Sequence, residues 1–268
     1  IISVSVPGGN GRMGKTLLGL IIENEKFNLS SSTCLPNEDE VGIDIGILVG
    51  KAKISKELNT DTSSLFQNSD VLIDFTVPDA TMFHARKCYE NNLSIVIGTT
   101  GLNKLQEEEL LNLSKKIPIV YSANFSIGVT LLSSLVSNST QMLGAEWDIE
   151  ILEMHHKHKI DAPSGTALLL GKSAAEARGQ DLSSVKSVSR NGIVGKRKES
   201  EIGFAVLRGG DVVGEHSVIF SSSGERIELV HKATDRSIFA SGALRASHWA
   251  ATADPGLYSL SDVLINGG

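Results

Sequence analysis

The chain has 268 residues and a formal net charge of −6, with 41% hydrophobic and 21% charged residues, as expected of a globular protein with one large or two smaller domains. This acidic balance excludes a general nucleic-acid-binding surface, because such domains are usually basic. The longest apolar runs are too short to span a membrane. Residues 1–6 predict a strand rather than a secretory leader, and Cys34 and Cys88 are expected to be free thiols, so we predict a cytoplasmic protein.

Apolar runs in the first half of the chain predict buried parallel strands. They cover residues 1–6, 70–76, 93–100 and 117–123, and segments with helical periodicity follow them at 12–25, 79–92 and 103–116. Asp79 is expected to cap the second of these helices. Alternation of strands and helices predicts an open, doubly wound α/β sheet of the Rossmann type.

The pattern changes after about residue 126. A long helix is predicted at 126–143, and strands that alternate apolar and polar residues at 147–154, 201–208, 215–222 and 225–232. Such alternation is typical of an antiparallel or mixed sheet with one face in solvent. Residues 178–200 predict a long polar loop, and residues 237–253 a last helix.

A glycine-rich turn follows the first predicted strand. Gly8, Gly11 and Gly14 are spaced three residues apart directly before a helix, which is a variant of the dinucleotide-binding turn. The first glycine permits the sharp turn, the second lets a pyrophosphate approach the backbone, and the third lets helix and strand pack closely. The free N–H groups of the helix start, and Arg12, suit phosphate. A tight turn without a ligand is the alternative.

The second strand, predicted at 28–36, lacks the residue that usually holds the adenosine ribose. An acid is expected about 20 residues after the turn, but Cys34 and Leu35 stand at the end of this strand. Glu38 and Asp39 follow slightly too late, and one of them is the candidate substitute. The choice between NADH and NADPH therefore stays open.

Two further polar turns suit the nicotinamide half of such a cofactor. "GTTG" (98–101) and "SANFS" (122–126) each end a predicted strand. Ligands of open α/β sheets bind at the carboxyl ends of the strands, so both turns are expected to face one crevice. The alternative is that both are ordinary polar strand ends.

The stretch "EMHHKHKIDAPSGTA" (153–167) concentrates positive charge in an acidic chain. If it is extended, His155, Lys157 and Lys159 share one side. "DAPSGTA" then predicts a helix start with Ser164 or Thr166 as its cap. Cations beside a helix N-terminus indicate a site for one or two carboxylates.

Three interpretations of this cluster compete. A zinc site is disfavoured, because adjacent histidines with cationic neighbours have poor ligand spacing. A solvated basic loop is the second. The third combines anion binding with catalysis, since histidine exchanges protons near neutral pH and a lysine among other cations can donate one to a carbanion.

These motifs together resemble the 4-hydroxy-tetrahydrodipicolinate reductase (dihydrodipicolinate reductase) family. The resemblance rests on blocks in the family's order along nearly the whole chain: "GRMG", "DFT.P" (74–78), "GTTG", "ANFS.GV" (123–129), "HH.HK.DAPSGTA" (155–167), "GFA..R.GD.VGEH" (203–216) and "FA.GA.R" (239–245). The block at 155–167 is the most specific of these. The chain departs from the family at Pro7, at Asn10 and at Cys34–Leu35, where the family often has Glu-Arg.

The resemblance implies a dinucleotide-binding domain of residues 1–126 with 236–268, and an α+β substrate-binding and tetramerisation domain with a mixed sheet at 127–235. It implies a homotetramer that takes a small dicarboxylate substrate and NADH or NADPH, without metal, membrane or nucleic acid. His155 and Lys159 correspond to the catalytic proton donors, and His156, Gly165 and Thr166 to substrate contacts. The residues that correspond to cofactor contacts are Gly8, Gly9, Asn10, Gly11, Arg12, Met13, Gly98, Thr99, Thr100, Ser122, Ala123, Asn124 and Phe125.

The implied reaction is an NAD(P)H-dependent reduction of 4-hydroxy-tetrahydrodipicolinate, via dihydrodipicolinate, to tetrahydrodipicolinate in lysine and diaminopimelate biosynthesis. Hydride goes to ring C4 and a proton comes from His155 or Lys159. Two rival functions remain: a nicotinamide dehydrogenase acting on an amino acid, and a non-catalytic NAD(P) sensor. Assays with the cyclic imine and with aspartate-type substrates discriminate among the three.

Overall fold

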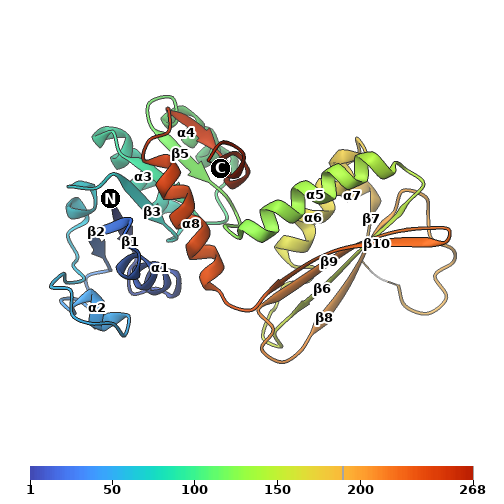
Figure 1. Cartoon of the computed structure of the whole chain (residues 1–268), viewed down its shortest axis with the longest axis horizontal. Helices are drawn as coiled ribbons and strands as arrows, with labels where there is room; N and C mark the ends of the chain where they lie inside the picture. Colours follow the sequence, from blue (N-terminus) through green and yellow to red (C-terminus); the bar gives the residue numbers. More distant parts are fainter. Residues whose placement is uncertain (189, 268) are drawn as a thin grey trace. The chain divides into compact units, whose positions relative to one another are not determined.

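Six parallel strands form the first of two sheets in this computed structural model, which describes residues 1–188 and 190–267. The sheet belongs to a unit of residues 1–127 and 237–268 (Figure 1). Its strand order is β11-β5-β4-β3-β1-β2. The strands are β1 (Ile2–Pro7), β2 (Phe27–Thr33), β3 (Val71–Asp74), β4 (Ser94–Ile97), β5 (Pro118–Tyr121) and β11 (Gly256–Tyr258).

Helices cover both faces of this sheet, as the near-continuous apolar strands require. Val71 and Ile73 join a core cluster with α1 and α8, whereas Leu72 between them joins a second cluster with α3 and α4. The elements are α1 (Arg12–Glu23), α2 (Ile45–Leu48), the 3-10 helix η1 (Thr62–Phe66), α3 (Pro78–Asn91), α4 (Lys104–Leu113), α8 (Ser237–Ala250) and α9 (Leu260–Asn266). The predicted Rossmann-type architecture is therefore confirmed.

The second unit, residues 128–236, contains a mixed sheet of order β10-β9-β6-β8-β7. β8 runs parallel to β6 and β7, and β9 runs antiparallel to β6 and β10. The elements are α5 (Ile127–Leu143), β6 (Asp148–His155), α6 (Gly165–Ala177), α7 (Leu182–Val185), β7 (Lys186–Ser187), β8 (Ile202–Arg208), β9 (Gly214–Ser222) and β10 (Glu225–Ala233).

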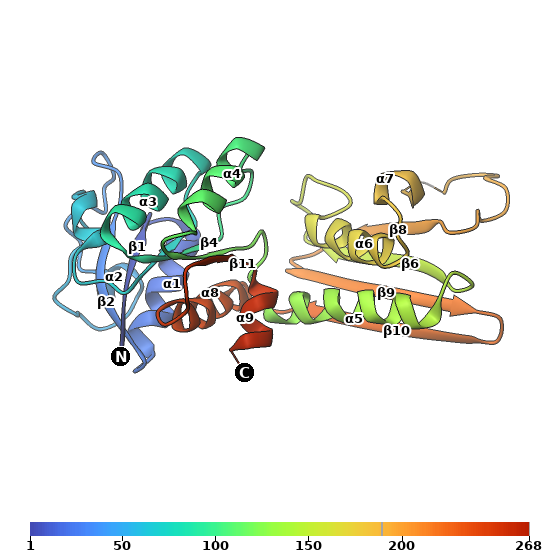
Figure 2. The same cartoon turned by 90° about the horizontal axis from the view of Figure 1, so that it is seen from above.

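Among the described residues of this unit, helices cover one face of the second sheet and leave the other uncovered (Figures 1 and 2). Ile149 and Ile151 of β6 pack with Leu170 of α6 and with Val136 of α5 in a buried cluster. The residues that alternate with them along β6, Glu150, Leu152 and Met154, stay partly exposed. The alternation predicted for these strands thus corresponds to a core face and an uncovered face.

Several local predictions were wrong. β2 ends at Thr33, so Cys34 and Leu35 lie beyond the strand predicted at 28–36. Asp79 does not cap α3, because Val77 is the N-cap residue and Pro78 begins the helix. Residues 178–200 include α7 and β7 rather than one continuous loop. No helix in the described ranges has the length and apolar content to cross a membrane.

Candidate functional site

The glycine turn between β1 and α1 has the geometry of a phosphate cradle. Gly8 has a φ of +68°, which other residues rarely adopt. A Cβ on Gly14 would lie 2.2 Å from the Gly8 carbonyl oxygen, so only glycine lets the helix start this close to the strand. Gly11 is the N-cap of α1 and provides no side-chain hydrogen bond. The first N–H groups of α1 are thus left for an anion.

Two further loops lie at the same edge of the sheet. The Gly98 N–H donates to the Asp74 carbonyl (2.8 Å), and the Ser122 N–H donates to the Ile97 carbonyl (3.1 Å). Because all strands are parallel, the ends of β1, β3, β4 and β5 are neighbours. A Cβ on Gly8 would lie 3.2 Å from Thr76. The structure therefore brings the predicted cofactor segments 8–13, 98–100 and 122–125 to one edge.

Two predicted cofactor residues have side chains that point into the protein. Thr99 is 3% exposed and accepts a hydrogen bond from the Thr81 hydroxyl (2.7 Å). Phe125 is 1% exposed, with its ring centre 5.6 Å from that of Phe75. These two residues have only their backbone to offer a ligand, and their side chains support the loops from beneath.

The loop after β3 is held by a buried contact between Asp74 and His84 that the sequence did not reveal. Asp74 is fully buried, and its Oδ2 lies 2.7 Å from Nδ1 of His84. Its Oδ1 accepts hydrogen bonds from the Thr76 N–H (2.8 Å) and hydroxyl (2.6 Å). This carboxylate therefore fixes the "DFT" segment beside the glycine turn.

Acidic side chains gather at the end of β2 despite the missing acid in the strand. Burial, and then the negative charges of Glu38 and Glu40, raise the pKa of the Cys34 thiol. Glu40 also forms an ion pair with Lys15 of α1 (3.4 Å). Glu38 is thus an acid near the end of β2. It is one of the two residues predicted to substitute for the missing acid that holds the adenosine ribose.

In the second unit, the cationic stretch begins where β6 ends. His155 is the last residue of β6 and is 8% exposed, and the chain then turns away from the strand. The side-sharing predicted for Lys157 and Lys159 on an extended strand therefore does not apply. Ser164 is the N-cap of α6, and its hydroxyl accepts from the Ala167 N–H (3.1 Å). Gly165 and Thr166 form the first turn of α6.

A buried carboxylate, Glu153, organises this site. It is 1% exposed, and its Oε2 lies 2.6 Å from Nδ1 of His155. Arg208 donates to both of its oxygens (2.7 and 3.0 Å), and the Ser164 N–H donates to Oε1 (3.0 Å). Burial by itself raises the pKa of Glu153, but these hydrogen bonds outweigh it and hold the pKa below the ordinary value.

The remaining cationic residues lie in the loop between β6 and α6. The Lys159 ammonium forms an ion pair with Asp161 (2.7 Å), and the backbone N–H of Lys159 donates to the His156 carbonyl (3.1 Å). His156 lies 3.5 Å from Arg236. Desolvation, and then the positive charges of Arg236 and His158, lower the pKa of His156. The predicted residues His155, His156, Lys159, Gly165 and Thr166 thus lie on one strand end, one loop and one helix start.

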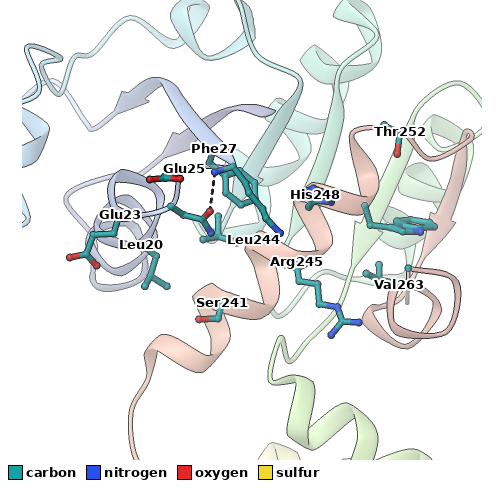
Figure 3. A pocket seen from close by; sticks show the side chains of 14 residues that line it. Leu20, Glu23, Glu25, Phe27, Ser241, Leu244, Arg245, His248, Thr252 and Val263 are labelled. Carbon is teal, nitrogen blue, oxygen red and sulfur yellow. Dashed lines mark hydrogen bonds between the residues drawn. The ribbon is translucent and has the colours of Figure 1, made fainter. Parts of the chain in front are cut away.

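A large hollow lies elsewhere. It measures about 1060 Å³ and has Phe27, Leu244 and Trp249 among its lining residues, with Glu23 and Arg245 also at its wall (Figure 3). Phe27 begins β2 and pairs with Ile2 at the start of β1. The hollow is therefore at the amino ends of the strands, whereas the glycine turn follows their carboxyl ends. It is separate from the predicted cofactor site.

Two family models match the chain. The model described as dihydrodipicolinate reductase, N-terminus, matches residues 2–125, and that described as dihydrodipicolinate reductase, C-terminus, matches residues 128–264. The chain belongs to the dihydrodipicolinate reductase family. This confirms the resemblance and the prediction of an oxidoreductase. The family's amino-terminal part is a Rossmann-type NAD(P)H-binding domain, so the cofactor is NADH or NADPH, as predicted.

Curated relatives in this family cover the whole chain. A 4-hydroxy-tetrahydrodipicolinate reductase from Parvibaculum lavamentivorans is 47% identical over 264 residues, which are 98% of this chain and 97% of the relative. One from Rhodopseudomonas palustris is 48% identical over 97% of this chain and 96% of its own length. One from Halorhodospira halophila is 41% identical over 98% of both chains.

Solved structures share the fold. A dipicolinate-bound dihydrodipicolinate reductase from Paenisporosarcina sp. TG-14 is 24% identical, with a TM-score of 0.79 over 98% of this chain and 99% of its own. An amine dehydrogenase from Mycobacterium smegmatis is 10% identical, with a TM-score of 0.59 over 97% of this chain and 95% of its own. The Rossmann-type sheet with a second mixed sheet is therefore the architecture of the dihydrodipicolinate reductase family.

Sequence reasoning missed three residues of the site: Glu153, Arg208 and His216. Glu153 stands in register with the buried Ile149 and Ile151 along β6. An acid at a buried position requires a partner, so this register was the available signal. Arg208 and His216 belong to the block at 203–216, but nothing in the sequence shows that they face residues about fifty positions away.

Proposed function

We propose that this dihydrodipicolinate reductase family member reduces 4-hydroxy-tetrahydrodipicolinate, via dihydrodipicolinate, to tetrahydrodipicolinate in lysine and diaminopimelate biosynthesis. The observation that carries the proposal is that the buried carboxylate of Glu153 joins His155 to the α6 helix start at Ser164, with Lys159 in the loop that connects them. Full-length relatives named as 4-hydroxy-tetrahydrodipicolinate reductases support it. The dipicolinate-bound neighbour supports a small dicarboxylate as the ligand.

The substrate is a cyclic imine with two carboxylates. Loss of its hydroxyl group as water leaves a conjugated ring. When bound, a reduced nicotinamide supplies the hydride that adds to ring C4. His155 or Lys159 then donates a proton to C3, which completes the addition of two hydrogens.

The substrate carboxylates bind to Lys159 and His156 of the loop and to the α6 helix start. Gly165 and Thr166 are in the first turn of α6, where backbone N–H groups and the helix dipole stabilise an anion. Asp161 holds the Lys159 ammonium at 2.7 Å, so a substrate carboxylate competes with Asp161 for this cation. His156 contributes a further hydrogen-bond donor in this loop. This local grouping lets an acidic protein attract a dianion.

The cofactor segments of the first unit fit a dinucleotide. Gly8 to Met13 hold the pyrophosphate on the helix start of α1, whose N-cap glycine leaves the N–H groups uncovered. The backbone of Gly98–Thr100 and of Ser122–Phe125 contacts the nicotinamide half. In this proposal residues 1–126 with 236–268 bind the cofactor, and residues 127–235 bind the substrate and build a homotetramer. We place the enzyme in the cytoplasm, in accord with two free, buried cysteines.

The test replaces His155→Ala and Lys159→Ala separately and follows cofactor oxidation with the cyclic imine. Each general acid should contribute about 10²-fold or more to kcat. A change confined to KM shows that Lys159 only binds. His158→Ala is the matched control, because His158 is exposed in the same loop and has no proposed role. Turnover of aspartate-type substrates instead, or cofactor binding without any turnover, overturns the proposed reaction.

A further inference from the structure

We infer that Glu153 is the positioning residue for His155. Its carboxylate holds the imidazole with a proton on Nδ1, so that Nε2 is the nitrogen that exchanges a proton with substrate. The same carboxylate also fixes the start of the anion-binding turn at Ser164. The catalytic part of this inference rests on the proposed function of His155.

The tautomer follows from the contact between the two side chains. Glu153 Oε2 and His155 Nδ1 are 2.6 Å apart, and Glu153 is 1% exposed. An ionised carboxylate only accepts hydrogen bonds, so Nδ1 must donate. The neutral ring then has its lone pair on Nε2, and the protonated ring has its exchangeable proton there.

Arg208 and Ser164 keep the Glu153 carboxylate from rotating. The two guanidinium nitrogens donate to different carboxylate oxygens, Nη1 to Oε2 at 2.7 Å and Nη2 to Oε1 at 3.0 Å. The Ser164 N–H donates to Oε1 at 3.0 Å. Such a bidentate pair fixes direction as well as distance. The ring of His155 and the N-cap of α6 are therefore oriented by a single group.

Gly214 leaves space beside Nε2 of His155 because it has no side chain. A Cβ on Gly214 would lie 3.0 Å from Nε2 and 3.3 Å from Cδ2 of His155. The ring of His216 lies edge-on at 5.1 Å and 73°, so it packs against His155 without covering it. No residue in the described parts of the chain forms a hydrogen bond with Nε2. This nitrogen is thus the one left for a substrate.

A purely structural role for Glu153 is the competing explanation, since the Glu153–Arg208 pair also joins β6 to β8. The chain contains a matched case on the same strand. Glu150 accepts two hydrogen bonds from Arg190 (2.7 and 2.9 Å) and one from Arg197 (3.0 Å), and it does not contact His155. Glu150→Gln therefore removes a comparable ion pair without touching the imidazole.

The first measurement needs no substitution at Glu153. Histidine labelled with ¹⁵N in the full-length chain distinguishes protonated from bare ring nitrogens, and His155→Gln assigns the signal. We expect the neutral His155 ring to have its proton on Nδ1. In Glu153→Gln the single amide oxygen accepts from the Ser164 N–H and Arg208 in place of Oε1, which leaves the amide N–H₂ facing His155 Nδ1. The N–H₂ then donates to Nδ1, so we expect the ring proton on Nε2. A wild-type ring with a bare Nδ1 overturns the inference whatever the activity.

The second measurement separates positioning from stability. In Glu153→Gln, kcat with the cyclic imine should fall by about 10²-fold, the lower bound for a general acid, while KM for the reduced dinucleotide stays within about threefold. Glu150→Gln should keep wild-type kcat. Glu153→Asp retains the charge, so it should recover part of the kcat that Glu153→Gln loses. If Glu153→Gln does not fold, the kcat of Glu153→Asp is compared with those of wild type and Glu150→Gln instead.

Failure of this inference differs from failure of the proposed function. If His155→Ala leaves kcat unchanged, His155 is not the proton donor, but the ¹⁵N signals still decide whether Glu153 sets its tautomer. If His155→Ala lowers kcat and Glu153→Gln matches Glu150→Gln, the proton donor stands and the positioning role is refuted.

Discussion

His216 lies on β9 with 4% of its surface exposed, and it shows how burial sets the charge of a single side chain. Desolvation, followed by the positive charge of His155, lowers its pKa to about 4, although the nearby Glu153 acts in the opposite direction. His231 and Lys159 add to the lowering. The ring is therefore neutral near pH 7, and its Nε2, 3.0 Å from the Ser164 hydroxyl, is able to accept a hydrogen bond.

This lowered pKa predicts a loss of stability in mild acid. Between pH 6.5 and 4, His216 is protonated in the unfolded chain but neutral in the folded chain. The free energy of unfolding therefore falls as pH falls. From pH 7.5 to pH 5 the effect is about 2 kcal/mol of unfolding free energy. Urea unfolding of wild type and His216→Gln at both pH values measures it. The variant accepts the Ser164 hydrogen bond without titrating, so its free energy should change by about 2 kcal/mol less. Equal changes in both proteins refute the assignment.

The N-cap of α6 connects one element to the site. The Ser164 hydroxyl accepts from the Ala167 N–H and contacts His216. The backbone N–H of Ser164 donates to Glu153. Ser259 is also the N-cap of a helix, α9, and forms a capping box with Asp262. The two serines have the same structural task in different units.

We predict that Ser164→Ala and Ser259→Ala both destabilise the fold but differ in function. Loss of a cap costs about 1 kcal/mol, and Ser164→Ala also leaves buried His216 without its partner, which adds about 1–3 kcal/mol. Only Ser164→Ala should raise KM for the dicarboxylate, because Ser164 begins the anion-binding turn. If the variant weakens binding by about 1.4 kcal/mol, the size of one hydrogen bond, KM rises about tenfold. Thermal unfolding and steady-state kinetics measure both effects. A raised KM in Ser259→Ala contradicts the distinction.

Elements with a strong hydrophobic period were predicted from the sequence, and short ones were not. The helix predicted at 126–143 is α5 (Ile127–Leu143), and the strand predicted at 225–232 is β10 (Glu225–Ala233). α2 (Ile45–Leu48) has only four residues and depends on Asp44, which accepts from the N–H groups of Gly46 and Ile47. β11 (Gly256–Tyr258) has three residues and pairs with β5 at the edge of the sheet. Neither is long enough to show a period.

The candidate site was predictable where its parts are contiguous in sequence. The glycine turn and the 155–167 block each specify a local structure that the chain adopts. Glu153 meets Arg208 across 55 positions, and Ser164 meets His216 across 52. These pairings depend on the strand order β9-β6-β8, which periodicity alone does not determine.

The uncovered face of the second sheet exposes apolar side chains that bear on how copies of the chain assemble. Leu207 is 48% exposed and Val230 is 49% exposed, and both alternate with residues that face α5 and α6. Leu152, Met154 and Ile219 are partly exposed on the same face. Contiguous exposed apolar side chains on a sheet mark a protein–protein interface. This face therefore supports the proposed homotetramer, with a second copy of the sheet as its partner.

Charge placed on this face should dissociate the assembly. We predict that wild type sediments as a tetramer, about four times the 28.5 kDa chain mass, and that Leu207→Glu with Val230→Glu sediments as a smaller species, because buried like charges oppose association. Ile265→Glu is the control, since Ile265 is 76% exposed on α9, outside this sheet. Sedimentation velocity measures the mass of each protein, and circular dichroism checks that the variants remain folded. A folded tetramer in the double variant shows that the copies associate through another surface, and a wild-type monomer refutes the homotetramer itself.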